Sequence, residues 1–118
     1  VSVTILSKIT VIERSDFEAC TSLEEIQIPS SVESIDERAF KNCYSLKKIE
    51  IPDAVLYIND YAFANCSSLE EVIIHSSRVQ FGDCVFSGCS SLKKIEVPSS
   101  LNIANLRLDK KVKVIKTK

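Results

Sequence analysis

The feature that most constrains this chain is a sequence repeat with a period of 23. Four of the five cysteines keep this spacing, and columns of phenylalanine and leucine keep it too. These columns are Cys20, Cys43, Cys66 and Cys89; Phe17, Phe40, Phe63 and Phe86; and Leu23, Leu46, Leu69 and Leu92. One coil of this length cannot bury its own apolar side, so neighbouring coils must stack and share one elongated core.

Each repeat contains a segment in which apolar and polar residues alternate: EEIQI, KKIEI, EEVII and KKIEV. The alternation predicts a half-buried strand, and stacking of the coils makes these strands parallel. Proline follows three of the strands, where its missing N–H ends the hydrogen-bonded ladder. A second short extended piece is expected at VESI and VLYI.

The remainder of each repeat must turn the chain back toward the next strand. DERAFKN and NDYAFAN predict one short helical turn that buries alanine and phenylalanine, with N-caps at Asp36, Asn59 and Gly82. Left-handed residues are expected where this turn ends, at Asn42, Asn65 and Gly88. The sequence therefore predicts an α/β repeat with a parallel sheet on one face and short helical turns and loops on the other.

We expect a single domain over residues 1–118. It opens with a partial repeat at 1–8, continues with repeats at 9–31, 32–54, 55–77 and 78–100, and ends in a cap strand at 101–118. Since the chain starts in mid-repeat and contains no methionine, we expect a processed product or a piece of a longer array.

The pattern V..I...AF..C.SL..I.IP, over roughly residues 9–98, resembles the BspA-like, or Treponema pallidum-type, class of leucine-rich repeat. The resemblance implies a right-handed leucine-rich-repeat solenoid with its parallel sheet on one face. Members of this class are similar to surface proteins of oral and gut bacteria and of protozoan parasites such as Trichomonas and Entamoeba. The resemblance thus implies a cell-surface or secreted protein that adheres to host proteins, while the residues themselves leave a cytosolic location open.

The periodic cysteines predict packing rather than chemistry. A zinc site needs closely spaced cysteine pairs that converge on one ion, whereas a spacing of 23 lines the sulfurs up in a column, one per coil. The spacing of adjacent coils would permit disulfides, but side chains in such a column run parallel, so we expect reduced core thiols. Cys84 instead shares a polar column with Ser15, Arg38 and Tyr61, which predicts an exposed free thiol, either accidental or available for intermolecular pairing.

Departures from the repeat on the outward side of the sheet are where a binding site is expected. Ile73 stands in a column otherwise filled by Gln27, Glu50 and Glu96, and His75 stands where proline ends the other strands. An apolar residue beside an amphipathic ring can anchor a partner. The alternative is sequence drift without functional meaning at a surface position. The candidate partner-binding residues are Glu25, Gln27, Lys48, Glu50, Glu71, Ile73, His75, Lys94 and Glu96.

Charge is nearly balanced overall, at a formal net value of -1, which gives no reason to expect nucleic acid as a partner. Pairs of glutamates and lysines alternate from strand to strand, at 24–25, 47–48, 70–71 and 93–94, so stacking should place opposite charges side by side.

The basic end LRLDKKVKVIKTK predicts a capping edge strand; attraction to anionic glycans or a membrane surface is the second reading. No apolar run approaches the roughly 20 residues of a membrane span.

These observations favour a non-catalytic module that binds an unknown protein, with Ile73 and His75 as its anchor. The alternative is a spacer or scaffold piece of a longer array, with no ligand of its own. An enzyme is not expected, because the chain has one histidine, no glycine-rich loop and only two glycines. We expect no cofactor, no metal and a monomer.

Overall fold

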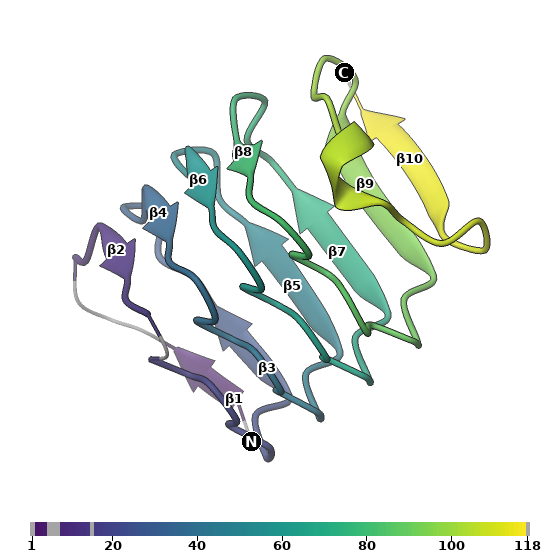
Figure 1. Cartoon of the computed structure of the whole chain (residues 1–118). Coiled ribbons are helices and arrows are strands. Elements are labelled where there is room, and N and C mark those ends of the chain that lie inside the picture. The colour runs from purple at the N-terminus through teal and green to yellow at the C-terminus, as the bar shows by residue number, and fades with distance from the viewer. Residues whose placement is uncertain (1, 5–7, 15, 118) are drawn as a thin grey trace.

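The chain winds into stacked coils, and a computed structural model describes residues 2–4, 8–14 and 16–117 of its 118 residues. Each regular coil adds one long and one short strand to two separate rows, which we call ladders (Figure 1). The long strands form a two-stranded sheet at the N-terminal end and a four-stranded sheet beyond it, and the short strands form one four-stranded sheet. The longer strands are β1 (Ser2–Thr4), β3 (Glu25–Gln27), β5 (Lys48–Ile51), β7 (Glu71–Ile74), β9 (Lys94–Pro98) and β10 (Lys113–Thr117). We call the face that they form the long-strand face.

The second ladder is made of two-residue strands: β2 (Val11–Ile12), β4 (Ser34–Ile35), β6 (Tyr57–Ile58) and β8 (Gln80–Phe81). These confirm the second extended piece that the sequence predicts. All described strand pairs are parallel, with partners such as Ile49 and Val72, or Ile35 and Ile58, one repeat apart. The fold prediction of a leucine-rich-repeat solenoid, with one coil for each sequence repeat, is confirmed.

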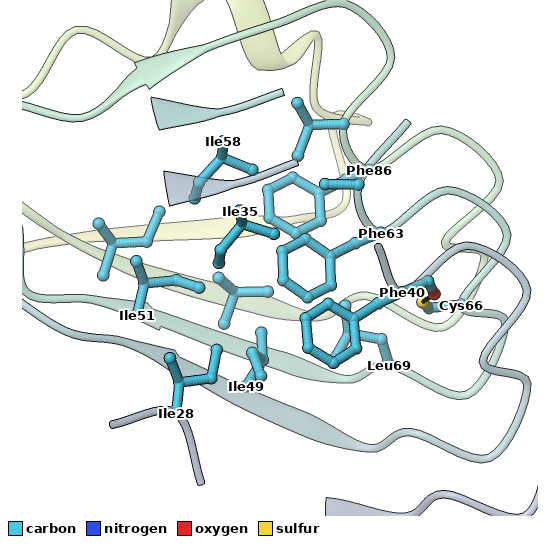
Figure 2. Packing of buried hydrophobic residues seen from close by; sticks show 14 of the residues in the cluster. Ile28, Ile35, Phe40, Ile49, Ile51, Ile58, Phe63, Cys66, Leu69 and Phe86 are labelled. Atoms are coloured by element: carbon cyan, nitrogen blue, oxygen red, sulfur yellow. Dashed lines mark hydrogen bonds between the residues drawn. The ribbon is translucent and has the colours of Figure 1, made fainter. Parts of the chain in front are cut away.

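The core is a set of columns that run along the stack of coils, because equivalent residues of successive repeats lie over one another. Four phenylalanines stack ring on ring, with centroids 5.2, 5.0 and 5.5 Å apart from Phe17 to Phe86. Phe40 and Phe63 are fully buried, and isoleucines of both ladders pack beside them (Figure 2). Full burial of such side chains is the main stabilising term, at about 1.5–3 kcal/mol each.

The predicted short helical turn, with its N-caps at Asp36, Asn59 and Gly82, is wrong. Residues 36–43 form successive turns, and the φ angle of Arg38 is +60° where a helix needs about −63°. The physical reason is that alternate N–H groups donate to the next coil, as those of Phe40 and Asn42 do, so the chain cannot use them for helical bonds. In the described residues the only helix is the 3₁₀ turn η1 (Ala104–Leu106).

The expected left-handed residues do occur, with φ angles of +64° at Asn42, +61° at Asn65 and +76° at Gly88. At the C-terminal end, β10 pairs with β9 and lies outermost on the long-strand face. The register offset between β9 and β10 is smaller than the offset between the preceding long strands. Lys113 pairs with Lys94, 19 positions earlier, whereas Lys94 pairs with Glu71, 23 positions earlier. The closing segment therefore does not reproduce a full coil.

Candidate functional site

The long-strand face brings the predicted column of outward residues together in register. Glu50 of β5, Ile73 of β7 and Glu96 of β9 are direct partners across adjacent strands. Ile73 is half-buried, although it lies on the outer side of the sheet. An apolar side chain is thus held between two carboxylate-bearing neighbours, which limits its contact with water without covering it.

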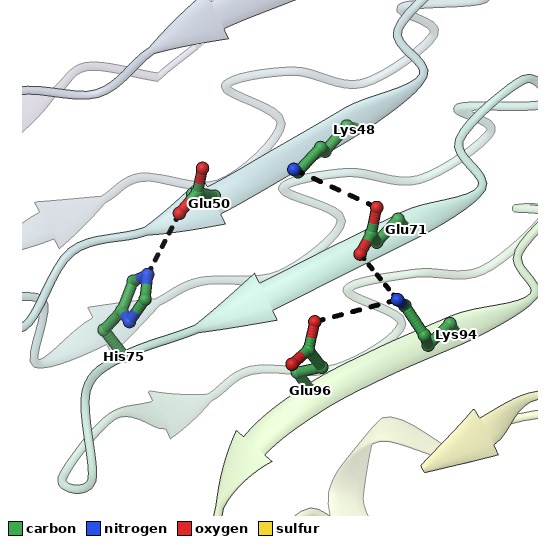
Figure 3. A network of polar contacts seen from close by, with 6 residues as sticks. All are labelled: Lys48, Glu50, Glu71, His75, Lys94 and Glu96. Carbon is green, nitrogen blue, oxygen red and sulfur yellow. Dashed lines mark hydrogen bonds and ion pairs between the residues drawn. The ribbon is translucent and has the colours of Figure 1, made fainter. Parts of the chain in front are cut away.

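Charged residues next to Ile73 form a continuous network over three strands (Figure 3). The Lys94 ammonium lies 3.0 Å from a carboxylate oxygen of Glu71 and 3.8 Å from one of Glu96. The second oxygen of Glu71 lies 4.0 Å from the Lys48 ammonium. The predicted alternation of charge is confirmed here, and one row further along, where Lys93 lies 3.5 Å from Glu70.

The same contacts shift the ionisation of two of these groups. A hydrogen bond from Lys94, together with the charges of Lys94 and Lys48, holds the pKa of the Glu71 carboxyl below its ordinary value. The same hydrogen bond, which the Glu71 carboxylate accepts, raises the pKa of Lys94. Both groups are therefore charged over the whole neutral range, and the pair leaves little net charge on this part of the face.

His75 follows β7 directly and is exposed, as its position in the repeat predicts. Unlike the prolines at the equivalent positions it has an N–H, which donates to the carbonyl of Ile51 over 2.9 Å and prolongs the ladder between β5 and β7. Its ring Nε2 lies 3.1 Å from a carboxylate oxygen of Glu50. Ile73 is consequently flanked by an ordered imidazole–carboxylate pair on one side and by the lysine–glutamate network on the other.

Two of the candidate residues, Glu25 and Gln27, lie on β3, nearer to the N-terminal end of the face, and both are exposed. The network of Figure 3 contains the other candidates except Ile73. Sequence reasoning missed one residue of this column, Ile115 of β10, which is the register partner of Glu96 and is half-buried. The alternation within KVKVIKTK carried the signal, but the shortened last step hid which position Ile115 would occupy.

The periodic cysteines lie in the core as free thiols, Cys43 and Cys66 fully buried and Cys20 and Cys89 partly so. Each thiol of the three later coils donates to a phenylalanine carbonyl, as Cys43 does to Phe17 over 3.1 Å and Cys66 does to Phe40 over 3.3 Å. Burial raises the pKa of Cys43 to about 11, and a hydrogen bond with Cys89 together with burial raises that of Cys66. Cys43 and Cys66 are therefore poor nucleophiles. Cys84 differs, because it is exposed.

The described part of the chain contains no group of three or more histidine, cysteine, aspartate or glutamate side chains placed to hold a metal ion. Ser15, which was expected to share the column of Cys84, lies outside the described residues. Within those residues no helix has both the length and the apolar character needed to cross a membrane.

Comparison with solved structures shows close likeness to two leucine-rich-repeat proteins. One is from Bacteroides ovatus, with a TM-score of 0.83 and 30% sequence identity over 99% of this chain and 30% of that one. The other is the leucine-rich-repeat protein of T. pallidum, with a TM-score of 0.77 and 34% identity over 86% of this chain and 50% of that one. This chain thus spans half or less of the length of either protein.

No curated protein matches the sequence. A family model for the BspA type leucine-rich repeat region, however, matches residues 1–116 in six copies. This match covers nearly the whole chain and agrees with the solenoid, the period and the structural neighbours, so the chain belongs to the BspA-type leucine-rich repeat family.

Proposed function

We propose that this chain is a non-catalytic module that binds a partner protein through the long-strand face, with Ile73 as the central contact. The observation that carries the proposal is the register of Ile73 between Glu50 and Glu96, which gives a half-buried apolar spot with a charged surround. Binding hot spots are apolar or amphipathic residues enclosed by contacts that exclude water, and this arrangement has that form.

The electrostatics of the face indicate what kind of surface would fit it. Lys48 and Lys94 are balanced by Glu71 and Glu96, and His75 is paired with Glu50. A partner of strongly acidic or basic character would gain little attraction from such a face. We therefore expect a partner that presents an apolar side chain to Ile73 within a polar rim of mixed charge.

For the identity of the partner, we propose a host extracellular protein and a location at the cell surface. This part of the proposal is supported by resemblance to surface proteins that adhere to host cells. The second candidate function is that of a spacer in a longer repeat array. It is favoured by the share of the two similar structures that this chain spans, 30% and 50% of their lengths.

The test replaces the anchor without disturbing the strand. Ile73→Thr keeps a β-branched side chain, and His75→Gln keeps a polar side chain and the backbone donor. The double variant and the original protein are immobilised and offered a panel of host extracellular-matrix proteins beside a cytosolic lysate. We expect the double variant to bind a captured matrix protein at least about tenfold more weakly, since loss of a hot spot costs more than about 1.4 kcal/mol.

Gln80→Asp, on β8 of the other ladder, is the matched control and should leave the affinity unchanged. Thermal unfolding of all three proteins verifies that the fold is intact. Equal affinity of the double variant and the original protein would remove Ile73 and His75 from the site. Absence of any captured protein would favour the spacer.

A further inference from the structure

Neighbouring coils are joined by a third set of main-chain hydrogen bonds, outside the two strand ladders. In this set every second N–H of the turn segment donates to the following coil. The N–H groups of Arg38, Phe40 and Asn42 donate to the carbonyls of Asp60, Ala62 and Ala64, and those of Tyr61, Phe63 and Asn65 donate to the carbonyls of Asp83, Val85 and Ser87, over 2.6–3.0 Å. Each of these two coils thus offers three donors toward its C-terminal neighbour.

The last full coil offers the same three donors, but no group in the described ranges accepts from them. By the repeat, the N–H groups of Cys84, Phe86 and Gly88 occupy the equivalent positions, and their acceptors would be the carbonyls of residues 106, 108 and 110. In the part of the chain that the structure describes, none of these three N–H groups donates to another group. Unpaired donors in a row form the edge of a ladder that another chain can extend.

A cavity of about 420 Å³ lies where the next coil would pack, with Cys84, Phe86 and Gly88 among its lining residues. Its opposite wall is the closing segment, which contributes the apolar side chains of Leu106, Leu108 and Val112. Two side chains of this segment bridge the gap. Asn105 donates to the carbonyl of Phe81 over 2.9 Å, and Lys111 donates to the carbonyl of Ser90 over 2.7 Å.

We propose that this cavity, which we call the end cavity, binds an extended peptide segment of another protein. The segment would present main-chain carbonyls at every second residue to Cys84, Phe86 and Gly88, and would lay an aromatic ring on Phe86. Two observations select this ligand. The donors continue an interface that the chain already makes between its coils, and Phe86, the last member of the phenylalanine stack, lines the cavity. The wall carries Arg107 and Lys111 against a single acidic residue, Asp109, and this small basic excess favours a segment that carries an acidic residue.

The chain itself supplies a probe with this chemistry. Residues 59–66 carry the three carbonyls that accept from Arg38, Phe40 and Asn42, together with Phe63 and Asp60. A synthetic peptide of this sequence, blocked at both ends and with Cys66→Ser, is titrated into the isotopically labelled full chain. We expect the amide proton resonances of Cys84, Phe86 and Gly88 to move downfield, as new hydrogen bonds to carbonyls form, while those of Tyr61, Phe63 and Asn65 stay in place.

Thiol labelling gives an independent readout because Cys84 lines the end cavity. With free peptide at about ten times its Kd, labelling of Cys84 should slow about tenfold, in proportion to the unoccupied fraction. A peptide with Phe63→Gln should bind at least about tenfold more weakly, because it cannot extend the ring stack. In the protein, Leu108→Trp should fill the cavity and abolish binding, whereas Lys110→Trp, outside the lining, should not.

The proposal is overturned if the peptide leaves the three amides unmoved, if it binds Leu108→Trp as tightly as the original protein, or if it shifts the amides around Ile73 instead. The experiment is separate from the test of the long-strand face. The double variant Ile73→Thr, His75→Gln should bind the peptide with unchanged affinity, so that either proposal can fail alone.

Discussion

Phe40 and Phe63 stack face to face, with ring centroids 5.0 Å apart and planes within 3° of parallel, although they belong to successive repeats of the chain. The same relationship recurs to Phe17 on one side and to Phe86 on the other, which makes the rings one continuous column. The column links each coil to both of its neighbours. Its inner members should therefore contribute more to stability than any exposed aromatic residue.

Replacement of Phe63 by alanine should lower the free energy of unfolding by about 3–5 kcal/mol, since it leaves a cavity between two rings. Urea denaturation followed by circular dichroism measures this loss. Tyr57→Ala is the control, because Tyr57 is 46% exposed and its loss should change stability by less than about 0.5 kcal/mol. A loss below about 1 kcal/mol for Phe63→Ala would contradict the packing described here.

Gly88→Ala should destabilise the protein by about 1–2 kcal/mol, because the φ angle at this position is +76° and a Cβ there would meet Oδ1 of Asn65. Tyr61→Gly makes the opposite exchange at a position with a φ angle of +60°. Removal of that Cβ should relieve strain and offset the loss of the contact between the Lys41 ammonium and the Tyr61 ring. Melting temperatures of the two variants should therefore move in different directions or by clearly different amounts.

Glu71→Gln should lower the free energy of unfolding at neutral pH, and the difference between the variant and the original protein should shrink in acid. The folded state lowers the pKa of Glu71, so its contribution is complete above the ordinary carboxyl pKa, near 4.5, and is lost as the pH falls through the lower folded value. Denaturation of the variant and of the original protein at pH 7 and at pH 3 measures this difference in the free energy of unfolding. As a control, Lys94→Gln should raise the pKa of Glu71, read from its carboxyl carbon resonance; an unchanged pKa would exclude Lys94 as the cause.

Thiol reagents should distinguish Cys84 from the buried cysteines. Cys84 is exposed, so it should react with the folded protein at once, and Cys84→Ser should remove this fast phase. With a pKa of about 11, Cys43 holds only about one thiolate in a thousand at pH 8, and burial blocks access to it as well. It should react only at the rate of unfolding. Equal rates for Cys43 and Cys84 would refute these placements.

The repetitive part of the fold could be predicted from the sequence because the same structural position recurs in several repeats, each with a similar residue. Ile49, for example, is one of four equivalent apolar residues, and that agreement fixed its strand and its inward direction. In the turn segments only the left-handed ends at Asn42, Asn65 and Gly88 could be predicted, and the conformation before them could not. Arg38 and Tyr61 adopt left-handed conformations for which neither residue type has a preference, because bonds between coils override local propensity.

The candidate site, too, could be predicted from the sequence only in part. The register of Glu50, Ile73 and Glu96 follows from the period alone. His75 could be placed at the surface from the sequence, but its contact with Glu50 depends on a side-chain orientation that only the structure provides. The end cavity could not be predicted at all. It exists because the closing segment returns to the long-strand face after fewer positions than a full repeat, and no periodic column describes a departure of that kind.

The third set of main-chain bonds also determines how the molecule would respond to force. A pull on the two termini loads the coils in series, and each coil is held only by its immediate neighbours. Under such a load the chain should come apart coil by coil from one end, and not in a single event. Each release frees one repeat of the chain, or roughly 80 Å when that repeat is extended. A protein built in this way can lengthen under tension at one end while the coils at the other end remain folded.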